Sequence, residues 1–219
     1  MRKSFHEELG DLRKNVLVMG RVVEENVARA VESLLDRNSS LADQVIESDK
    51  KIDRMDMKIE QGCMVLLARQ QPVAVDLRMI NTILRMIIHL ERMGDLAANI
   101  AQIAKEPTFD HYPSRIIDLF QEMAGLVQDL VGRSLRAFAD EDRRLTLSLN
   151  DLDKPIDELY HQLIREFGQL HGDEELMNWA TTMVLASRYL ERIADHAVSI
   201  GERVAYLVTG NYADLHIVD

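Results

Sequence analysis

Four pairs of acidic residues are the part of this sequence best suited to chemistry. The two acids of each pair stand four residues apart, so on a helix both carboxylates project from one side, with Cβ atoms about 5–6 Å apart. The pairs are Asp49/Asp53, Glu91/Asp95, Asp153/Asp157 and Glu191/Asp195. Like charges at this spacing destabilise an isolated helix by about 0.2–0.5 kcal/mol each, so four such pairs point to a compensating ligand. Carboxylate oxygens suit Mg²⁺, Mn²⁺, Ca²⁺ or iron.

Interpretations of the acidic pairs that require no bound ligand stay open. The helical period directs Glu91 and Asp95 about 140–180° away from the centre of their apolar stripe, onto an outer face where charged residues are ordinary. Arginines such as Arg92 and Arg192 could pair with nearby acids instead of leaving them for a cation.

Asp153 has a second alternative, and two histidines could extend the sites. Pro155 follows Asp153 by two residues, and proline is accepted in a first helical turn, so Asp153 could be a helix N-cap. His161 lies four residues after Asp157, and His196 follows an acid directly, so either ring could add a metal ligand.

Motifs for catalysis are missing from the sequence. It contains a single Glu-x-x-His pair, Glu158 and His161, whereas a ferritin-like di-iron oxidase is built from two. It also lacks the P-loop, the dinucleotide-binding glycine turn and the His-Glu-x-x-His zinc motif. We therefore expect a protein that is not an enzyme.

Six amphipathic stretches must position the acids. Apolar residues recur at steps of three and four, the helical period, over residues 9–34, 41–66, 79–104, 116–137, 145–170 and 176–207. Breaks fall at residues 38–40, at 70–72, at 107–113, at 172–173 and at Gly210. Short turns between long helices favour antiparallel packing in a bundle.

The two halves of the chain repeat one another. A shift of 104 residues carries Asp49 and Asp53 onto Asp153 and Asp157, and a shift of 100 carries residues 90–92 onto residues 190–192. Helical period alone would align apolar positions but not these charged ones. The sequence therefore predicts an all-α fold of two tandem three-helix bundles, residues 1–107 and 113–219, formed by internal duplication.

The composition of the chain limits the kinds of partner that it can bind. The formal net charge of −11 disfavours nucleic acid and anionic membrane surfaces, because both are bound through lysine and arginine. The single cysteine, Cys63, falls on an apolar stripe and is expected to be a buried hydrophobe in a reducing compartment. No run approaches the ~18 apolar residues that a membrane span needs, so we expect a cytoplasmic protein that meets membranes only through partners.

Three short motifs carry a resemblance to a known family. Residues 71–78 read QPVAVDLR, residues 90–95 read LERMGD, and residues 190–195 read LERIAD. Together with the length and the duplication, these resemble the PhoU family over essentially the whole chain. The last motif departs from the family pattern at Ala194, where glycine is usual.

The resemblance implies a function as well as a fold. It implies a cytoplasmic accessory protein, often a homodimer, that bridges the ATPase subunit of the phosphate ABC transporter and the sensor histidine kinase. In that role it restrains phosphate uptake and the transcriptional two-component response when phosphate is plentiful. Family members can carry metal clusters on paired acidic motifs, and these match the eight acids above. Two alternatives remain: a metal-dependent phosphoester hydrolase, and a helical scaffold without metal.

Overall fold

The computed structural model describes residues 2–106, 113–172 and 174–211, and these residues form six α-helices and no strand. The helices are α1 (Arg2–Leu35), α2 (Ser39–Gln70), α3 (Ala74–Ile103), α4 (Ser114–Asp140), α5 (Arg143–Gly168) and α6 (Glu174–Thr209). The expected all-α fold of two tandem three-helix bundles is therefore confirmed. The expected connection at residues 107–112 and the N-cap at Asp173 lie outside the described residues, and the domain limits at 107 and 113 stay predictions.

Local sequence signals explain where the helices begin and end. Asn38 caps α2, its side chain accepting a hydrogen bond from the N–H of Leu41, and Asp142 caps α5 in the same way. Gly210 follows α6 with φ of +70°, a conformation that glycine adopts without steric penalty. The short turns capped by Asn38 and Asp142 allow α2 to fold back on α1 and α5 to fold back on α4.

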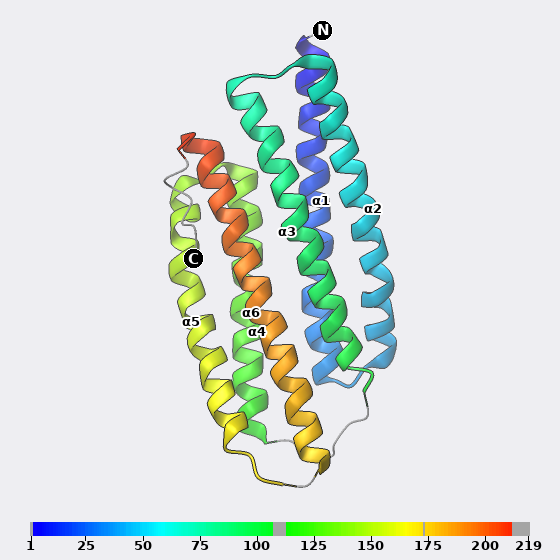
Figure 1. Ribbon diagram of the computed structural model, residues 1–219, viewed down its shortest axis with the longest axis vertical. Coiled ribbons are helices and arrows are strands. Elements are labelled where there is room, and N and C mark those ends of the chain that lie inside the picture. The colour runs from blue at the N-terminus through cyan, green and yellow to red at the C-terminus, as the bar shows by residue number, and fades with distance from the viewer. Residues whose placement is uncertain (1, 107–112, 173, 212–219) are drawn as a thin grey trace.

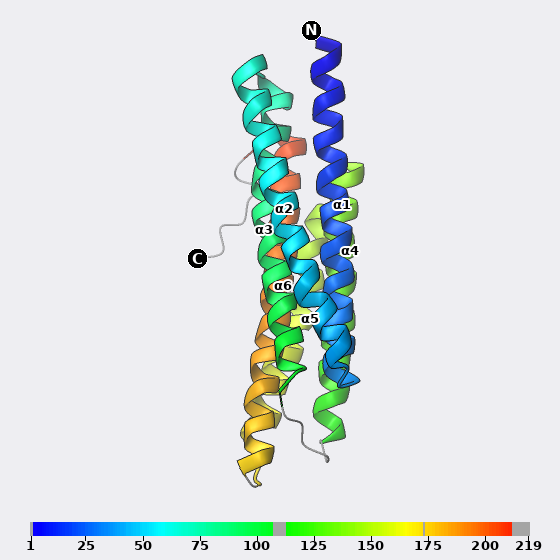
Figure 2. The ribbon, with the colours of Figure 1, turned by 90° about the vertical axis from the view of Figure 1, so that its right-hand side faces the viewer.

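Four of the six helices make the centre of the molecule. Helices α1, α3, α4 and α6 contact one another around a square, while α2 packs outside α1 and α3, and α5 packs outside α4 and α6. Figure 1 shows α5, α6, α3 and α2 across the front with α1 and α4 behind them, and Figure 2 shows the two layers from the side. One continuous apolar core runs through both halves, and it includes Cys63, as expected.

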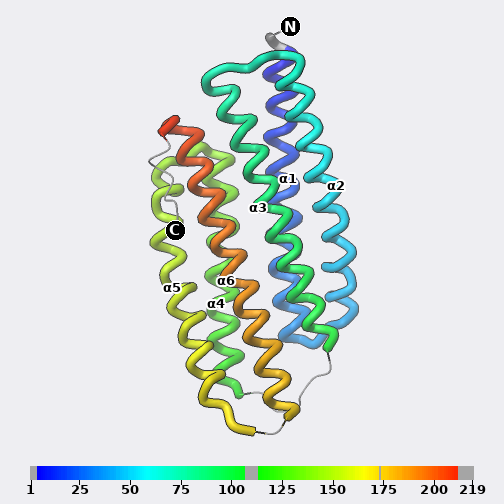
Figure 3. The backbone as a smooth tube through the Cα atoms, in the orientation of Figure 1, coloured from blue at the N-terminus to red at the C-terminus, as the bar shows by residue number. Residues whose placement is uncertain are grey.

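The two halves meet through antiparallel helix pairs. Between α3 and α6, Arg78 donates to the carbonyl of Leu207, and Thr82 donates to the carbonyl of Arg203. Further along, a ring nitrogen of His89 lies 3.2 Å from a ring nitrogen of His196. The residue numbers rise on one helix as they fall on the other, as the tube in Figure 3 also shows. An approximate twofold axis across the α3–α6 seam therefore relates the halves.

The turn between α2 and α3 exposes apolar side chains. Gln71 and Ala74 both take positive φ values, 47° and 50°, which are uncommon for residues other than glycine. Val73 and Val75 are exposed beside them. This segment carries the first family motif, and the hydrogen bond from Arg78 ties it to the end of α6.

Within the described ranges, no helix is both long enough and apolar enough to cross a membrane.

Arg13 links α1, in the first half of the chain, to the C-terminal end of α4, in the second half. Its guanidinium donates to the carbonyls of Ala139 at 2.6 Å and Phe138 at 3.3 Å. It also lies 2.8 Å from the carboxylate of Glu141 and covers the ring of Phe138. A cation that satisfies the last carbonyls of a helix is favourably placed in the helix dipole.

We expect Arg13→Ala to lower the free energy of unfolding by about 1–2 kcal/mol, because it leaves these carbonyls and Glu141 without their donor. The matched control is Lys14→Ala, which removes an exposed side chain paired with Asp11 and should change stability by less than about 0.5 kcal/mol. Urea unfolding followed by circular dichroism compares the two. Equal stabilities would show that the contact between α1 and α4 does not depend on Arg13.

Candidate metal centres

The first acidic cluster lies where α2 faces α3. Asp49 and Asp53 project from α2, and Glu91 and Asp95 project from α3. Burial, followed by the charges of Asp53 and Asp95, raises the pKa of Asp49 to about 6. Burial and the charge of Asp95 also raise the pKa of Glu91, and acids on α2 add to the effect. The carboxylates of the two helices are therefore close enough to repel one another.

Gly94 brings the two helices together at this cluster. A Cβ atom at position 94 would lie 2.8 Å from Oδ1 of Asp49 and 2.9 Å from Cδ1 of Ile52, closer than real Cβ atoms approach. Glycine therefore lets the α3 backbone reach the carboxylate of Asp49. That Oδ1 atom is buried and has no hydrogen-bond partner among the described residues, which is unusual for a carboxylate oxygen.

The second cluster repeats this arrangement between α5 and α6. Burial, followed by the charges of Asp157, Asp195 and Glu191, raises the pKa of Asp153 to about 7. Burial and the charge of Asp157 raise the pKa of Asp195, and burial and Asp195 raise that of Glu191. One carboxylate oxygen of Asp153 and one of Glu191 are buried without a partner in the described part of the chain. All eight acids proposed from the sequence thus fall into two inter-helix clusters of four.

The two clusters differ in charge and burial. Asp56 adds a fifth acid to the first cluster, since its charge contributes to the raised pKa of Glu91. The duplication places Tyr160 at the corresponding position of the second half, and the guanidinium of Arg188 lies over its ring. The Glu191 side chain is 13% exposed, against 27% for Glu91. The second cluster is therefore less acidic and more enclosed.

Arginines form ion pairs with several of these carboxylates. Arg92 contacts Glu91 at 3.4 Å and Asp95 at 3.2 Å, and Arg188 pairs with Glu191. Among the described residues, no three His, Cys, Asp or Glu side chains already stand in a geometry that could hold a metal ion. The sequence-based alternative that arginines pair with the acids thus describes part of the arrangement. The acids converge on each other, but their oxygens do not form a finished coordination shell.

The structure bears on two further interpretations of the sequence, those of Asp153 as an N-cap and of His161 as a metal ligand. Asp153 is not an N-cap: α5 begins at Arg143 with Asp142 as its cap, and Pro155 lies inside the helix. His161 is exposed on α5 and its ring lies beside that of Tyr160.

His196 faces away from the acids toward α3, where it meets His89. Sequence reasoning missed this histidine pair and also Asp56. Asp56 could have been found, because it continues the acidic stripe of α2 three residues after Asp53.

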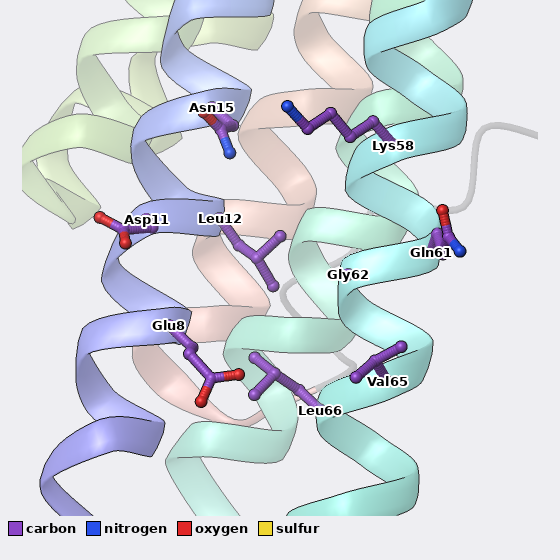
Figure 4. Close-up of a pocket in the computed structure, with 9 residues that line it drawn as sticks. All are labelled: Glu8, Asp11, Leu12, Asn15, Lys58, Gln61, Gly62, Val65 and Leu66. Atoms are coloured by element: carbon purple, nitrogen blue, oxygen red, sulfur yellow. The ribbon is translucent and has the colours of Figure 1, made fainter.

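A separate pocket of about 340 Å³ opens between α1 and α2, on the other side of α2 from the acidic cluster. Figure 4 shows Lys58 reaching across it toward α1, with Leu12 and Leu66 in the space between the helices. Its acids are already paired, Glu8 with Arg69 and Asp11 with Lys14.

Comparisons with known proteins agree with this architecture. A Pseudomonas aeruginosa protein named "Phosphate-specific transport system accessory protein PhoU homolog" is 39% identical over 209 residues, which is 95% of this chain and 86% of that protein. A Methanothermobacter thermautotrophicus relative with the same name, numbered homolog 1, is 30% identical and aligned over 94% of each chain.

Two solved structures of PhoU proteins share the fold of this chain. The crystal structure of PhoU from Pseudomonas aeruginosa matches with a TM-score of 0.87 at 38% identity, over 94% of this chain and all of that one. The phosphate transport system regulatory protein PhoU from Streptococcus pneumoniae matches with a TM-score of 0.88 at 30% identity, over 95% of this chain and 98% of that one. The PhoU domain profile matches twice, at residues 16–104 and 120–204. The chain therefore belongs to the PhoU domain family.

Proposed function

We infer that this chain is an accessory regulator of a phosphate-specific transport system and acts without catalysing a reaction. The observation that carries this proposal is the match along nearly the full length of relatives named as accessory or regulatory proteins of phosphate transport. The protein would restrain phosphate uptake and the phosphate two-component response when phosphate is plentiful. It would do so from the cytoplasm, as a homodimeric adaptor between the transporter ATPase and the sensor histidine kinase.

The two acidic clusters are proposed to hold divalent or iron cations. Support comes from the unpartnered oxygens of Asp49, Asp153 and Glu191, which are acceptors that a cation would satisfy. Burial, and after it the neighbouring carboxylates, raise the pKa of Asp49 and of Asp153, and a bound cation would stabilise the ionised form of both side chains. When bound, the ions would cross-link α2 to α3 and α5 to α6. Binding requires Arg92 and Arg188 to release their carboxylates.

Removing one cluster should halve the metal content. We expect the double variant Glu91→Gln/Asp95→Asn to lose about half of the Mn²⁺ or iron bound by the wild-type protein, because the α5–α6 cluster stays intact. Elemental analysis after metal loading and gel filtration measures this. The control is Asp118→Asn/Glu122→Gln, which neutralises an exposed acidic pair with the same spacing on α4. The proposal fails if the two variants hold equal amounts of metal.

Metal affinity should rise with pH between about 5 and 7. Only the ionised carboxylate binds a cation, and Asp49 and Asp153 have pKa values raised to about 6 and about 7. Below these values protons compete with the metal, so binding at pH 5.5 should be at least about tenfold weaker than at pH 7.5 and should release protons. Calorimetric titration with Mn²⁺ in buffers of different ionisation enthalpy measures both effects. Affinity that does not change with pH would contradict binding at these carboxylates.

The regulatory role is tested by affinity capture from cells of the source organism grown in high and low phosphate. We expect the tagged chain to retain the phosphate transporter ATPase and the sensor histidine kinase, identified by mass spectrometry. Deleting the gene should raise expression of phosphate-starvation genes in phosphate-rich medium. Unchanged expression after deletion would contradict the regulatory role. Turnover of phosphoesters by the metal-loaded protein would instead support the hydrolase alternative.

A further inference from the structure

One side of α2 carries both apolar and basic side chains that are exposed to solvent. We call it the outer face of α2, and its residues are Lys51, Arg54, Met57, Lys58, Met64 and Val65. Met57 is 58% exposed and Met64 is 56% exposed, and they stand about two helical turns apart on one side of the helix. Side chains this exposed add little to the core, so they are available to another molecule.

The groove between α1 and α2 borders this face. Its volume is about 340 Å³, with Lys58 at one end and Val65 and Leu66 at the other (Figure 4). The two helices approach closely at Gly62, where a Cβ atom would lie 2.6 Å from Cδ2 of Leu12, closer than real Cβ atoms approach. The outer face therefore continues into a groove with an apolar floor.

Basic side chains gather where the outer face meets the groove. At about 100° per residue, Lys51, Arg54 and Lys58 fall within about 60° of one another around the helix, and all three are exposed. The acids of the same stretch lie on the side of α2 towards α3, and they are Asp53, Asp56 and Glu60. The groove side of α2 is therefore positive in a chain whose net charge is −11.

The acids on the α1 wall of the groove leave this positive charge in place, because each has a basic partner outside the outer face. A carboxylate oxygen of Glu8 lies 3.5 Å from a guanidinium nitrogen of Arg69, and one of Asp11 lies 3.5 Å from Nζ of Lys14. These two pairs are neutral, so the net charge beside the groove comes from the outer face of α2.

The duplication provides an internal control for this surface. A shift of 104 residues carries α2 onto α5, which packs against α4 and α6 as α2 packs against α1 and α3. The α5 residues that correspond to Lys51, Arg54, Met57, Lys58 and Met64 are Pro155, Glu158, His161, Gln162 and Gly168. The same packing thus forms without the three cations and the two methionines. Folding of the bundle does not explain them, and they point to a contact outside the chain.

A helix with acidic residues beside an apolar stripe is the occupant that this surface fits. Its apolar stripe would contact the methionines, whose flexible side chains adapt to a partner, and its carboxylates would reach the cations. Residues 51–65 extend for about 21 Å at 1.5 Å per residue, which matches about four turns of a second helix lying alongside α2.

An anionic membrane surface is the competing occupant. A flat surface pressed against α2 would meet the acids on its α3 side as well as the cations, whereas a helix about 10 Å wide can lie along the groove without covering those acids. Interfacial helices also use aromatic side chains to enter the bilayer, and α2 contains no aromatic residue. Both observations favour the helix.

We propose that the outer face of α2 and the adjoining groove form the docking surface for an acidic amphipathic helix of a partner protein. The groove lies on the other side of α2 from the first acidic cluster, so docking does not require a bound metal. Remote acids of the chain repel such a helix only weakly, because salt screens charges beyond about 8 Å. The proposal goes beyond the adaptor role and holds whichever protein supplies the helix.

The first test selects peptides without assuming their sequence. A phage-displayed library of helix-forming peptides of about 16 residues, more than four helical turns, is selected against the full-length protein. The enriched peptides should carry net negative charge and have apolar residues three, four and seven positions apart. Enrichment of neutral or basic peptides, or no enrichment over a surface without the protein, would overturn the proposal.

The tightest acidic peptide is then titrated against two variants by fluorescence anisotropy. Arg54→Gln/Lys58→Gln should weaken binding at least about fivefold, because two charge pairs across the interface are lost. The matched control Arg136→Gln/Arg165→Gln removes two exposed arginines, one on α4 and one on α5, and should bind within about twofold of wild type. Raising the salt from about 0.05 M to about 0.5 M should weaken binding to the wild type. Equal affinity of the two variants would contradict docking at this face.

A second measurement uses the wild-type protein. In spectra of protein labelled with ¹³C at the methionine methyl groups, the signals of Met57 and Met64 should shift as the acidic peptide is added. Met177 on α6 is the reference, because it is also exposed but lies outside the outer face, and its signal should stay fixed. Unchanged signals of Met57 and Met64 at saturating peptide would place the binding site elsewhere and overturn the proposal.

Vesicles decide between a partner helix and a membrane. After sedimentation with vesicles of equal parts phosphatidylcholine and phosphatidylserine, the protein should remain in the supernatant. Vesicle binding that Arg54→Gln/Lys58→Gln abolishes would overturn the proposal and assign the surface to a membrane. The metal and phosphate-regulation proposals have separate readouts and stand or fall independently of these results.

Discussion

The antiparallel contact of α3 with α6 is the constraint on which the rest of the molecule depends. Each of these helices is apolar over a wide arc, because it packs against two helices of its own half and against the other half as well. A single three-helix bundle would leave part of that arc in water, at a cost of about 25 cal/mol per Å² of apolar surface. Joining two bundles through α3 and α6, and through α1 and α4 behind them, buries it. The same contact fixes where the acidic clusters and the histidine pair stand.

Duplication has produced two related sites rather than two copies of one site. Around the first cluster the chain has Asp56 on α2 and the exposed Ile88 on α3, whereas the corresponding positions of the second half hold Tyr160 and Arg188. In the second half an aromatic ring, that of Tyr160, thus stands in place of the Asp56 carboxylate, and the guanidinium of Arg188 covers this ring. A cation arriving at the first cluster would meet more negative charge and more solvent, and one arriving at the second would meet a drier site. Under the proposal that both clusters bind cations, the two would differ in affinity although their backbones correspond.

Much of the fold could be predicted from the sequence, because helical period and turn residues are local signals. The breaks at Asn38, Gln71 and Gly210 are all where the side chains and glycine indicated. The acidic clusters could be predicted because duplicated charged residues cannot be explained by apolar periodicity.

Contacts between distant helices were harder to foresee. The pairing of His89 with His196 depends on the relative position of α3 and α6, which no spacing within either helix encodes. The helix predicted over residues 145–170 already enclosed Asp153, and α5 indeed begins at Arg143. The N-cap alternative for Asp153 was nevertheless left open, since a proline within a helix and a proline in its first turn look alike in sequence.

The placement of the two acidic clusters on opposite sides of the α3–α6 contact has a consequence for recognition at a distance. One cluster lies between α2 and α3 and the other between α5 and α6, so both flanks present negative potential to an approaching molecule, in keeping with the net charge of −11. At physiological ionic strength this potential reaches about 8–10 Å from the surface. A basic partner surface is therefore attracted to either flank, and only short-range contacts can select between the two.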